Sequence, residues 1–187
     1  MGQYQKEPRR GFQYKRTTPL VVSQGNLAIC WAAALESWLN TEIRENGEQT
    51  GTWEGEVAKK NFFEGSTWKR EQLDVKQILV RWKDLINSDG SLKTENMPMI
   101  ALEIGMVGSV FLPSLLKEES LQEKIRNGSL YIIYFSVVMN HAIVGYGYDT
   151  SDGLFVMDPH LGLITRKVEF FKEPTRLQKM MFIGWKV

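Results

Sequence analysis

The segment SQGNLAICWAAALESWLN, residues 23–40, contains Cys30, the only cysteine of the 187-residue chain. Its alanine-rich composition favours a helix, and the apolar residues from Cys30 to Leu39 predict that this helix is mostly buried. The serine, glycine and asparagine within residues 23–26 supply a turn directly before it. Cys30 is therefore expected at or near the helix N-terminus, where unpaired N–H groups and the helix dipole favour a thiolate.

Composition and charge limit the class of protein. The length allows one domain with a sizeable core, and 43% hydrophobic and 24% charged residues are ordinary for a globular chain. Because the net charge is only +1, we expect neither nucleic acid nor a membrane as a partner. A single cysteine excludes an internal disulfide and a multi-cysteine metal site, so we expect no metal and no cofactor.

The character of the sequence changes along the chain. Up to about residue 127 it predicts helices over residues 30–39, 54–63, 70–87, 97–106 and 114–127, with a polar loop over 40–52. Beyond that point, β-branched and aromatic runs predict strands over residues 129–138, 141–148, 154–159, 163–171 and 180–187. We therefore expect an α+β fold with a single domain over residues 1–187. Residues 20–127 form a helical lobe, residues 128–187 form a β lobe, and residues 1–19 form a flexible or peripheral arm.

A histidine and an aspartate in the β region complete a candidate catalytic set with Cys30. His141 begins the strand HAIVGYGYD, and Asp158 in VMDP follows after one hairpin-like turn. An adjacent antiparallel strand would bring Asp158 back beside His141. An imidazole there could activate the thiol, and the carboxylate would orient the ring and stabilise its protonated form. This is a coherent set of nucleophile, base and orienting acid.

Gln24, six residues before Cys30, supplies a fourth function. Acyl transfer through a thiolate creates an oxyanion, which needs preorganised hydrogen-bond donors. The Gln24 side-chain amide and the Cys30 backbone N–H would provide two.

These residues resemble the papain-like cysteine proteases. Gln24 before Cys30-Trp31 at a helix start, then His141 opening a strand, then a carboxylate one hairpin later, follow that pattern in order. The segments HAIVGYGYD and VMDP resemble most the bacterial C39-like peptidases and C70-type secreted effector proteases. The cysteine segment AICWA departs from the CGSCW-like pattern of the secreted cathepsins. The resemblance implies a helical left lobe carrying Cys30 and a β right lobe carrying His141 and Asp158.

Each candidate residue also has a plainer interpretation. Cys30 alone fits a buried structural thiol, because free cysteines are among the most buried residue types. His141 alone fits a core histidine, Asp158 a turn former, and Gln24 a loop residue. The four residues together favour catalysis. His160 is expected as an exposed turn histidine, with a minor hypothesis that it covers the His141–Asp158 pair.

The leading interpretation is a cysteine endopeptidase acting on a protein substrate, as a bacterial effector or interbacterial toxin domain. The resemblance then implies a cognate inhibitor or immunity protein as a partner. It also implies a location in the cytoplasm, or delivery by a specialised system into a target cell, since the sequence shows no signal peptide. Specificity residues are expected in the loops of residues 44–69 and 105–113.

Other functions remain open at this point. A glutamine deamidase or transglutaminase would use the same Cys-His-Asp order on a side-chain amide. A peptidoglycan amidase, a leader-peptide processing domain and a catalytically inactive binding module are further alternatives.

Overall fold

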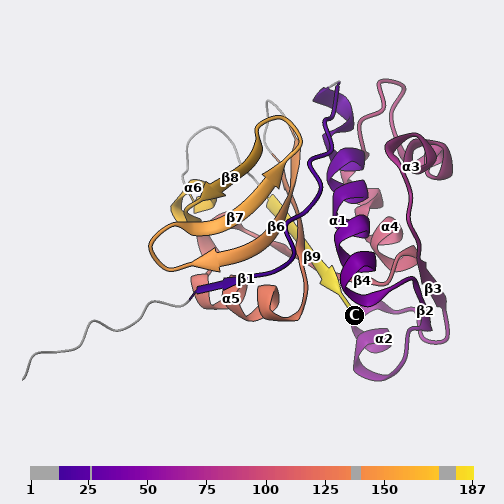
Figure 1. Cartoon of the computed structure of the whole chain (residues 1–187). Helices are drawn as coiled ribbons and strands as arrows, with labels where there is room; N and C mark the ends of the chain where they lie inside the picture. The colour runs from indigo at the N-terminus through magenta and orange to yellow at the C-terminus, as the bar shows by residue number, and fades with distance from the viewer. Residues whose placement is uncertain (1–12, 26, 136–139, 173–179) are drawn as a thin grey trace, which may run out of the picture.

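Helix α1 (Cys30–Asn46) lies between a large antiparallel sheet and the helices α3 (Val75–Arg81) and α4 (Met97–Glu103), as Figure 1 shows. The structure is a computed structural model and describes residues 13–25, 27–135, 140–172 and 180–187. None of the helices in these ranges is long and apolar enough to cross a bilayer.

The large sheet has seven strands, all paired antiparallel. Six of them follow the order β4-β9-β5-β6-β7-β8. The seventh, β1, pairs with the second half of β6, on the edge that β5 leaves free. The strands are β1 (Gln13–Lys15), β4 (Met106–Phe111), β5 (Leu130–Phe135), β6 (His141–Asp149), β7 (Gly153–Asp158), β8 (Gly162–Arg166) and β9 (Met180–Lys186).

The remaining elements cover the ends and edges of this arrangement. A second, two-stranded sheet is formed by β2 (Gln49–Thr52) and β3 (Thr67–Arg70), on either side of α2 (Gly55–Asn61). Helix α5 (Glu118–Asn127) precedes β5, and α6 (Val168–Lys172) follows β8. Short 3-10 turns occur at Leu27–Ile29, Lys83–Leu85, Thr94–Asn96 and Pro113–Leu115.

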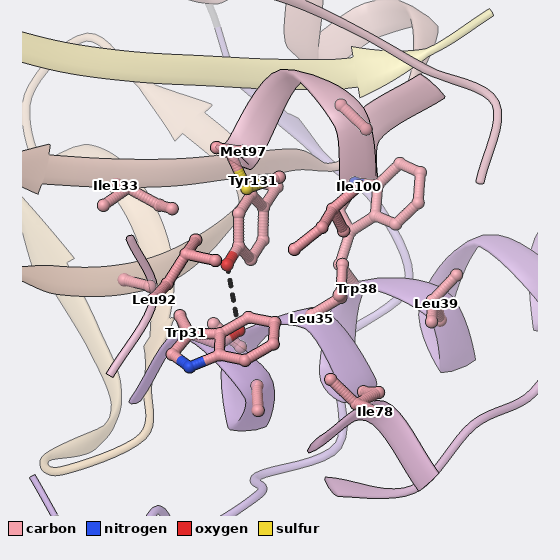
Figure 2. Close-up of a cluster of buried hydrophobic side chains, with 14 of the residues drawn as sticks. Trp31, Leu35, Trp38, Leu39, Ile78, Leu92, Met97, Ile100, Tyr131 and Ile133 are labelled. Carbon is pink, nitrogen blue, oxygen red and sulfur yellow. Dashed lines mark hydrogen bonds between the residues drawn. The ribbon is translucent and has the colours of Figure 1, made fainter. Parts of the chain in front are cut away.

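The core consists of apolar clusters on the two faces of the sheet, because strand side chains alternate between the faces. Helix α1 is buried over most of its length: its first turns are apolar, and its buried polar residues form hydrogen bonds, such as Thr41 to the Ser37 carbonyl. Figure 2 shows how Trp31 and Trp38 of α1 pack among side chains of α3, α4 and β5. The Tyr131 hydroxyl donates to the Trp31 carbonyl at 2.9 Å, so this cluster also satisfies its polar groups.

The α+β class and the order of the main elements are confirmed, and two local predictions are wrong. Residues 40–52 do not form a loop, since α1 continues to Asn46 and β2 follows it. The strand expected over residues 163–171 ends at Arg166 and gives way to α6, whose buried Phe171 packs against the sheet. Strand β4 comes from the part of the chain before residue 127 and joins the large sheet by pairing with β9.

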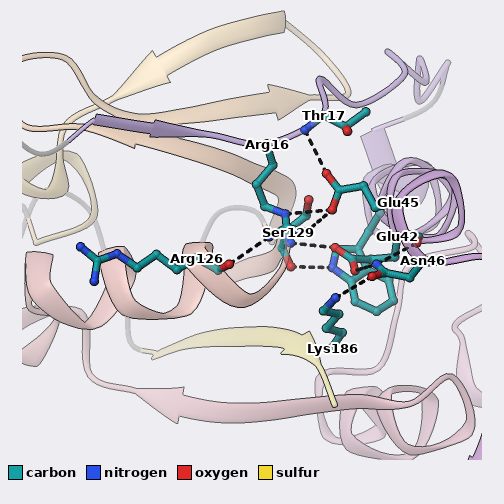
Figure 3. Close-up of polar contacts among 9 residues, drawn as sticks. Arg16, Thr17, Glu42, Glu45, Asn46, Arg126, Ser129 and Lys186 are labelled. Atoms are coloured by element: carbon teal, nitrogen blue, oxygen red, sulfur yellow. Dashed lines mark hydrogen bonds and ion pairs between the residues drawn. The ribbon is translucent and has the colours of Figure 1, made fainter.

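The N-terminal residues 13–24 form a strap that joins the sheet to α1 (Figure 3). After β1, the Arg16 guanidinium binds the Glu45 carboxylate, and the Thr17 N–H donates to the same carboxylate at 2.9 Å. Ser37 then donates to the Leu20 carbonyl at 2.8 Å. Residues 13–19 of the expected flexible or peripheral arm are thus held against the sheet and α1, while residues 1–12 lie outside the described residues.

Glu45→Gln tests the strap. Burial raises the pKa of Glu45, but hydrogen bonds from Arg16 and Thr17 outweigh it and lower the pKa below its usual value of 4.5. The carboxylate therefore stabilises the fold above pH 4.5, and this contribution is lost as the pH falls through the lowered pKa. We expect Glu45→Gln to reduce the free energy of unfolding by about 1–3 kcal/mol at pH 7 in urea titrations.

Glu56→Gln is the matched control, because the Glu56–Lys59 pair is exposed. Its effect should stay below about 1 kcal/mol. Equal effects of the two substitutions would contradict this role of the strap. So would a difference in the free energy of unfolding between the wild type and Glu45→Gln that stays the same at acidic pH.

Candidate active site

Cys30 is the first residue of α1, as the sequence predicts. The preceding 3-10 turn ends at Ile29, which provides no side-chain cap, so no side chain of that residue competes for the first N–H groups of the helix. The Cys30 thiol is buried, with 4% of the residue exposed, and its Sγ lies 3.6 Å from the carbonyl oxygen of Asn140. The contact brings the helix N-terminus against the start of β6, although the two residues are 110 positions apart.

His141 and Asp158 lie together at the same end of the sheet. His141 Nε2 is 3.0 Å from Asp158 Oδ1, and both side chains are almost fully buried. The same Oδ1 accepts the backbone N–H groups of His160 at 2.8 Å and Leu161 at 3.2 Å. The turn that follows β7 therefore fixes the carboxylate, and the carboxylate fixes the imidazole with Nδ1 left for the thiol.

The charges of this group are coupled. Burial opposes protonation of His141, but the hydrogen bond to Asp158 and a weaker one to Cys30 outweigh it and raise the pKa of His141 from 6.5 to about 9. Burial raises the pKa of Asp158, yet the hydrogen bonds from His141 and the His160 N–H lower it overall. At neutral pH the arrangement therefore favours an imidazolium between a carboxylate and the sulfur.

An aromatic ring contacts His141 from the neighbouring strand. Tyr134 of β5 lies directly opposite His141 in the sheet, and the two ring centroids are 5.5 Å apart in an edge-on arrangement. Tyr134 is held in turn by edge-on contacts with Phe170 and Phe171 of α6. His160 is exposed, as expected for a turn histidine, so the ring packed against His141 is that of Tyr134.

Gln24 lies beside the Asp158 turn. Its backbone N–H donates to the Pro159 carbonyl at 3.3 Å, and only 4% of the residue is exposed. Its side-chain oxygen is buried and has no hydrogen-bond partner among the described residues. An unpaired buried acceptor is costly, and in native proteins such groups often have a functional explanation.

The segment beside Cys30 on the helical lobe is the loop from Ile86 to Leu92. Trp31 Nε1 donates to the Gly90 carbonyl at 2.9 Å, and Gly90 packs so closely on Ile29 that an added Cβ would lie 2.9 Å from its Cγ2. The Asp89-Gly90 sequence is typical of a turn, but it gives no indication of what the turn contacts.

The two loops expected to carry specificity lie in different places. Most of residues 44–69 form the end of α1, the β2–β3 sheet and α2 between its strands, at the other end of α1 from Cys30 (Figure 1). Part of residues 105–113 borders an apolar groove of about 340 Å³ between α4 and the β4–β9 strand pair. This groove is lined by Thr94, Glu95, Met97, Pro98, Val110, Met180 and Phe182.

The comparisons with known proteins give the fold. No protein-family model matches the sequence, and no curated protein is similar to it in sequence. Several solved structures are similar. The double glycine motif protease of an AMS/PCAT transporter, solved with the leader peptide, superimposes with a TM-score of 0.52 and 17% identity, covering 94% of this chain and 99% of that one.

Two further structures agree. The peptidase domain of Streptococcus ComA, a bifunctional ABC transporter of a quorum-sensing pathway, gives a TM-score of 0.51 at 12% identity, over 89% of this chain and 97% of that one. A Bacillus anthracis protein assigned as a C39-like peptidase gives 0.52 at 11% identity, over 94% and 98%. The chain therefore has the papain-like fold of C39-like peptidase domains.

NMR titration of the His141 imidazole tests the coupling within the site. We expect a midpoint at about pH 9 in the wild type. Asp158→Asn removes the strongest interaction that raises the pKa of His141 and Cys30→Ala removes a weaker one, so both should lower the midpoint, the former more. A wild-type midpoint near 6.5, or no change in either variant, would contradict the arrangement.

The same pKa of His141 predicts a pH-dependent stability. Because the pKa is about 9 in the folded protein against 6.5 for a free histidine, the contribution of His141 is complete below pH 6.5 and is lost as the pH rises through 9. We expect the free energy of unfolding of the wild type, relative to His141→Gln, to fall across this range in urea titrations. A constant difference would show that His141 is not stabilised by its partners.

Proposed function

We propose that this protein is a cysteine endopeptidase that cleaves a polypeptide through Cys30, His141 and Asp158. The observation that carries the proposal is the His141–Asp158 hydrogen bond of 3.0 Å beside a cysteine at a helix N-terminus. The C39-like fold supports a peptidase, and one neighbour was solved with the leader peptide, which supports a polypeptide as substrate.

The proposed reaction has two steps. With its proton already held by His141, Cys30 Sγ attacks the carbonyl carbon of the scissile bond. His141 then gives this proton to the leaving nitrogen, the C–N bond breaks, and a thioester remains on Cys30. Water attacks this thioester and loses a proton to the neutral His141, the C–S bond breaks, and the acid leaves, which restores the sulfur beside the His141 imidazolium.

Gln24 is proposed as an oxyanion donor together with the Cys30 backbone N–H. The support is its burial beside the Asp158 turn and its place six residues before Cys30. Loss of one such donor typically costs 10²–10³-fold in rate. Gln24→Ala should therefore lower kcat more than it raises KM.

Two biological settings fit this activity. The resemblance to C70-type proteases supports an effector or toxin domain, acting in the cytoplasm of a target cell and restrained by a cognate inhibitor or immunity protein. The two neighbours from transporters, one of them solved with the leader peptide, instead favour processing of a leader peptide.

A second chemistry uses the same residues. A glutamine deamidase or transglutaminase would attack a side-chain amide and release ammonia instead of a new N-terminus. Mass spectrometry separates the two chemistries, because deamidation adds about 1 Da and leaves the polypeptide intact.

The proposal is tested by expressing the wild type and Cys30→Ala in bacterial cytoplasm and comparing new N-termini by mass spectrometry. We expect discrete cleavages that disappear in Cys30→Ala and fall by roughly 10³-fold or more in His141→Ala. Asp152→Asn, which alters an exposed carboxylate on the β6–β7 turn, serves as the matched control for Asp158→Asn. Crosslinks or deamidation without cleavage would favour the deamidase or transglutaminase over the peptidase. If the wild type and Cys30→Ala gave the same products, both functions would be rejected.

A further inference from the structure

Two exposed leucines lie on the β7–β8 hairpin, directly after Asp158. Leu161 is 53% exposed and Leu163 is 46% exposed, and we call this pair the hairpin surface. The Leu161 backbone N–H donates to Asp158 Oδ1, the oxygen that also binds His141. The hairpin surface is therefore connected to the candidate catalytic group by a direct hydrogen bond.

The hydrogen bonds of Asp158 place the tip of this hairpin beside His141. Asp158 is the last residue of β7, and its Oδ1 lies 3.0 Å from His141 Nε2 while it accepts the backbone N–H groups of His160 and Leu161 in the turn. Because β7 pairs with β6 on the side away from β5, the tip is the neighbour of His141 on that side. Tyr134 occupies the opposite side.

The second leucine faces the lobe that carries Cys30. Leu163 pairs with Met157, and paired residues of adjacent strands point to the same face of a sheet. Met157 belongs to the cluster that contains Cys30 and packs against α1. Leu163 remains exposed on this face because β8 is the last strand of the sheet.

The apolar groove described above lies on the other side of His141. Residues of β9 and β4 line this groove. In the sheet, β9 lies two strands from β6 on one side, whereas β7 and β8 lie on the other side of β6. A peptide that crosses the strand ends past Cys30 therefore has the groove on one side of its scissile bond and the hairpin surface on the other. Since His141 must reach the leaving nitrogen and the hairpin tip adjoins His141, the leaving segment lies at the hairpin.

We infer that the hairpin surface binds an apolar side chain in the first two residues after the scissile bond. The inference rests on the proposed peptidase function and names the class of substrate: a polypeptide with Leu, Ile, Val, Met or Phe at one of the first two positions after the cleavage point. The hairpin lies about one strand spacing, about 4.8 Å, from His141. One extended residue spans about 3.3 Å and two span about 6.6 Å, so the side chain that reaches the hairpin belongs to one of the first two residues.

The first test uses a peptide library prepared by tryptic digestion of a bacterial proteome. Wild-type protein is expected to produce new N-termini enriched in apolar residues at the first two positions. The double variant Leu161→Ser/Leu163→Ser should lose this enrichment. Val80→Ser, which alters a 65% exposed valine on α3, should keep it.

A second measurement separates a local effect from misfolding. The best-cleaved peptide is compared with an aminomethylcoumarin amide of the same acyl sequence, which lacks the leaving residues. We expect the double variant to lose about tenfold in kcat/KM on the peptide and much less on the coumarin amide. Equal losses on both substrates, or an unchanged preference in the double variant, would overturn the inference. Absence of any cleavage by the wild type would reject the proposed function with it, whereas cleavage without apolar enrichment would reject this inference alone.

Discussion

The contact between the N-terminus of α1 and the start of β6 is the constraint on which the rest of the structure depends. It brings Cys30 of one lobe to His141 of the other, and the proposed reaction depends on this contact. The sheet supplies the other half of the geometry, because the antiparallel β6–β7 pair returns the chain to His141 at Asp158. The rigid helix α1 and the rigid β6–β7 hairpin thus meet at one point. A preorganised site requires that its residues are held by rigid elements in this way.

Buried polar groups hold the two lobes together at the other end of α1. Glu42 is fully buried and accepts the Ser129 N–H at 2.7 Å, at the start of β5 (Figure 3). Arg70 of β3 is also fully buried, with its guanidinium 5.3 Å from the ring centroids of both Trp38 and Trp68 and its Nη2 donating to the Gly105 carbonyl at 2.7 Å. These contacts and the strap fix the angle at which α1 meets the sheet, and so the position of Cys30.

The sequence indicates the main elements and the candidate residues because both depend on local signals. The alanine-rich helix after Cys30 and the β-branched strands from residue 130 onward show clear patterns, and the order of Gln24, Cys30, His141 and Asp158 needs no contact information. The missed features depend on tertiary contacts. Residues 106–111 form strand β4 because they pair with β9. Tyr134 contacts His141 because β5 pairs with β6. Likewise, Gly90 is placed beside Ile29 and Trp31 by the packing of its loop on the start of α1.

The most direct test of the account is the rate at which iodoacetamide alkylates the protein at pH 6.5, followed by intact mass. Cys30 is the only cysteine, so every carbamidomethyl group reports on the site. If His141 and Asp158 activate the thiol, the wild type should react at least about tenfold faster than His141→Ala, with Asp158→Asn between them. Equal and slow alkylation of all three proteins would contradict the account and identify Cys30 as a buried structural thiol.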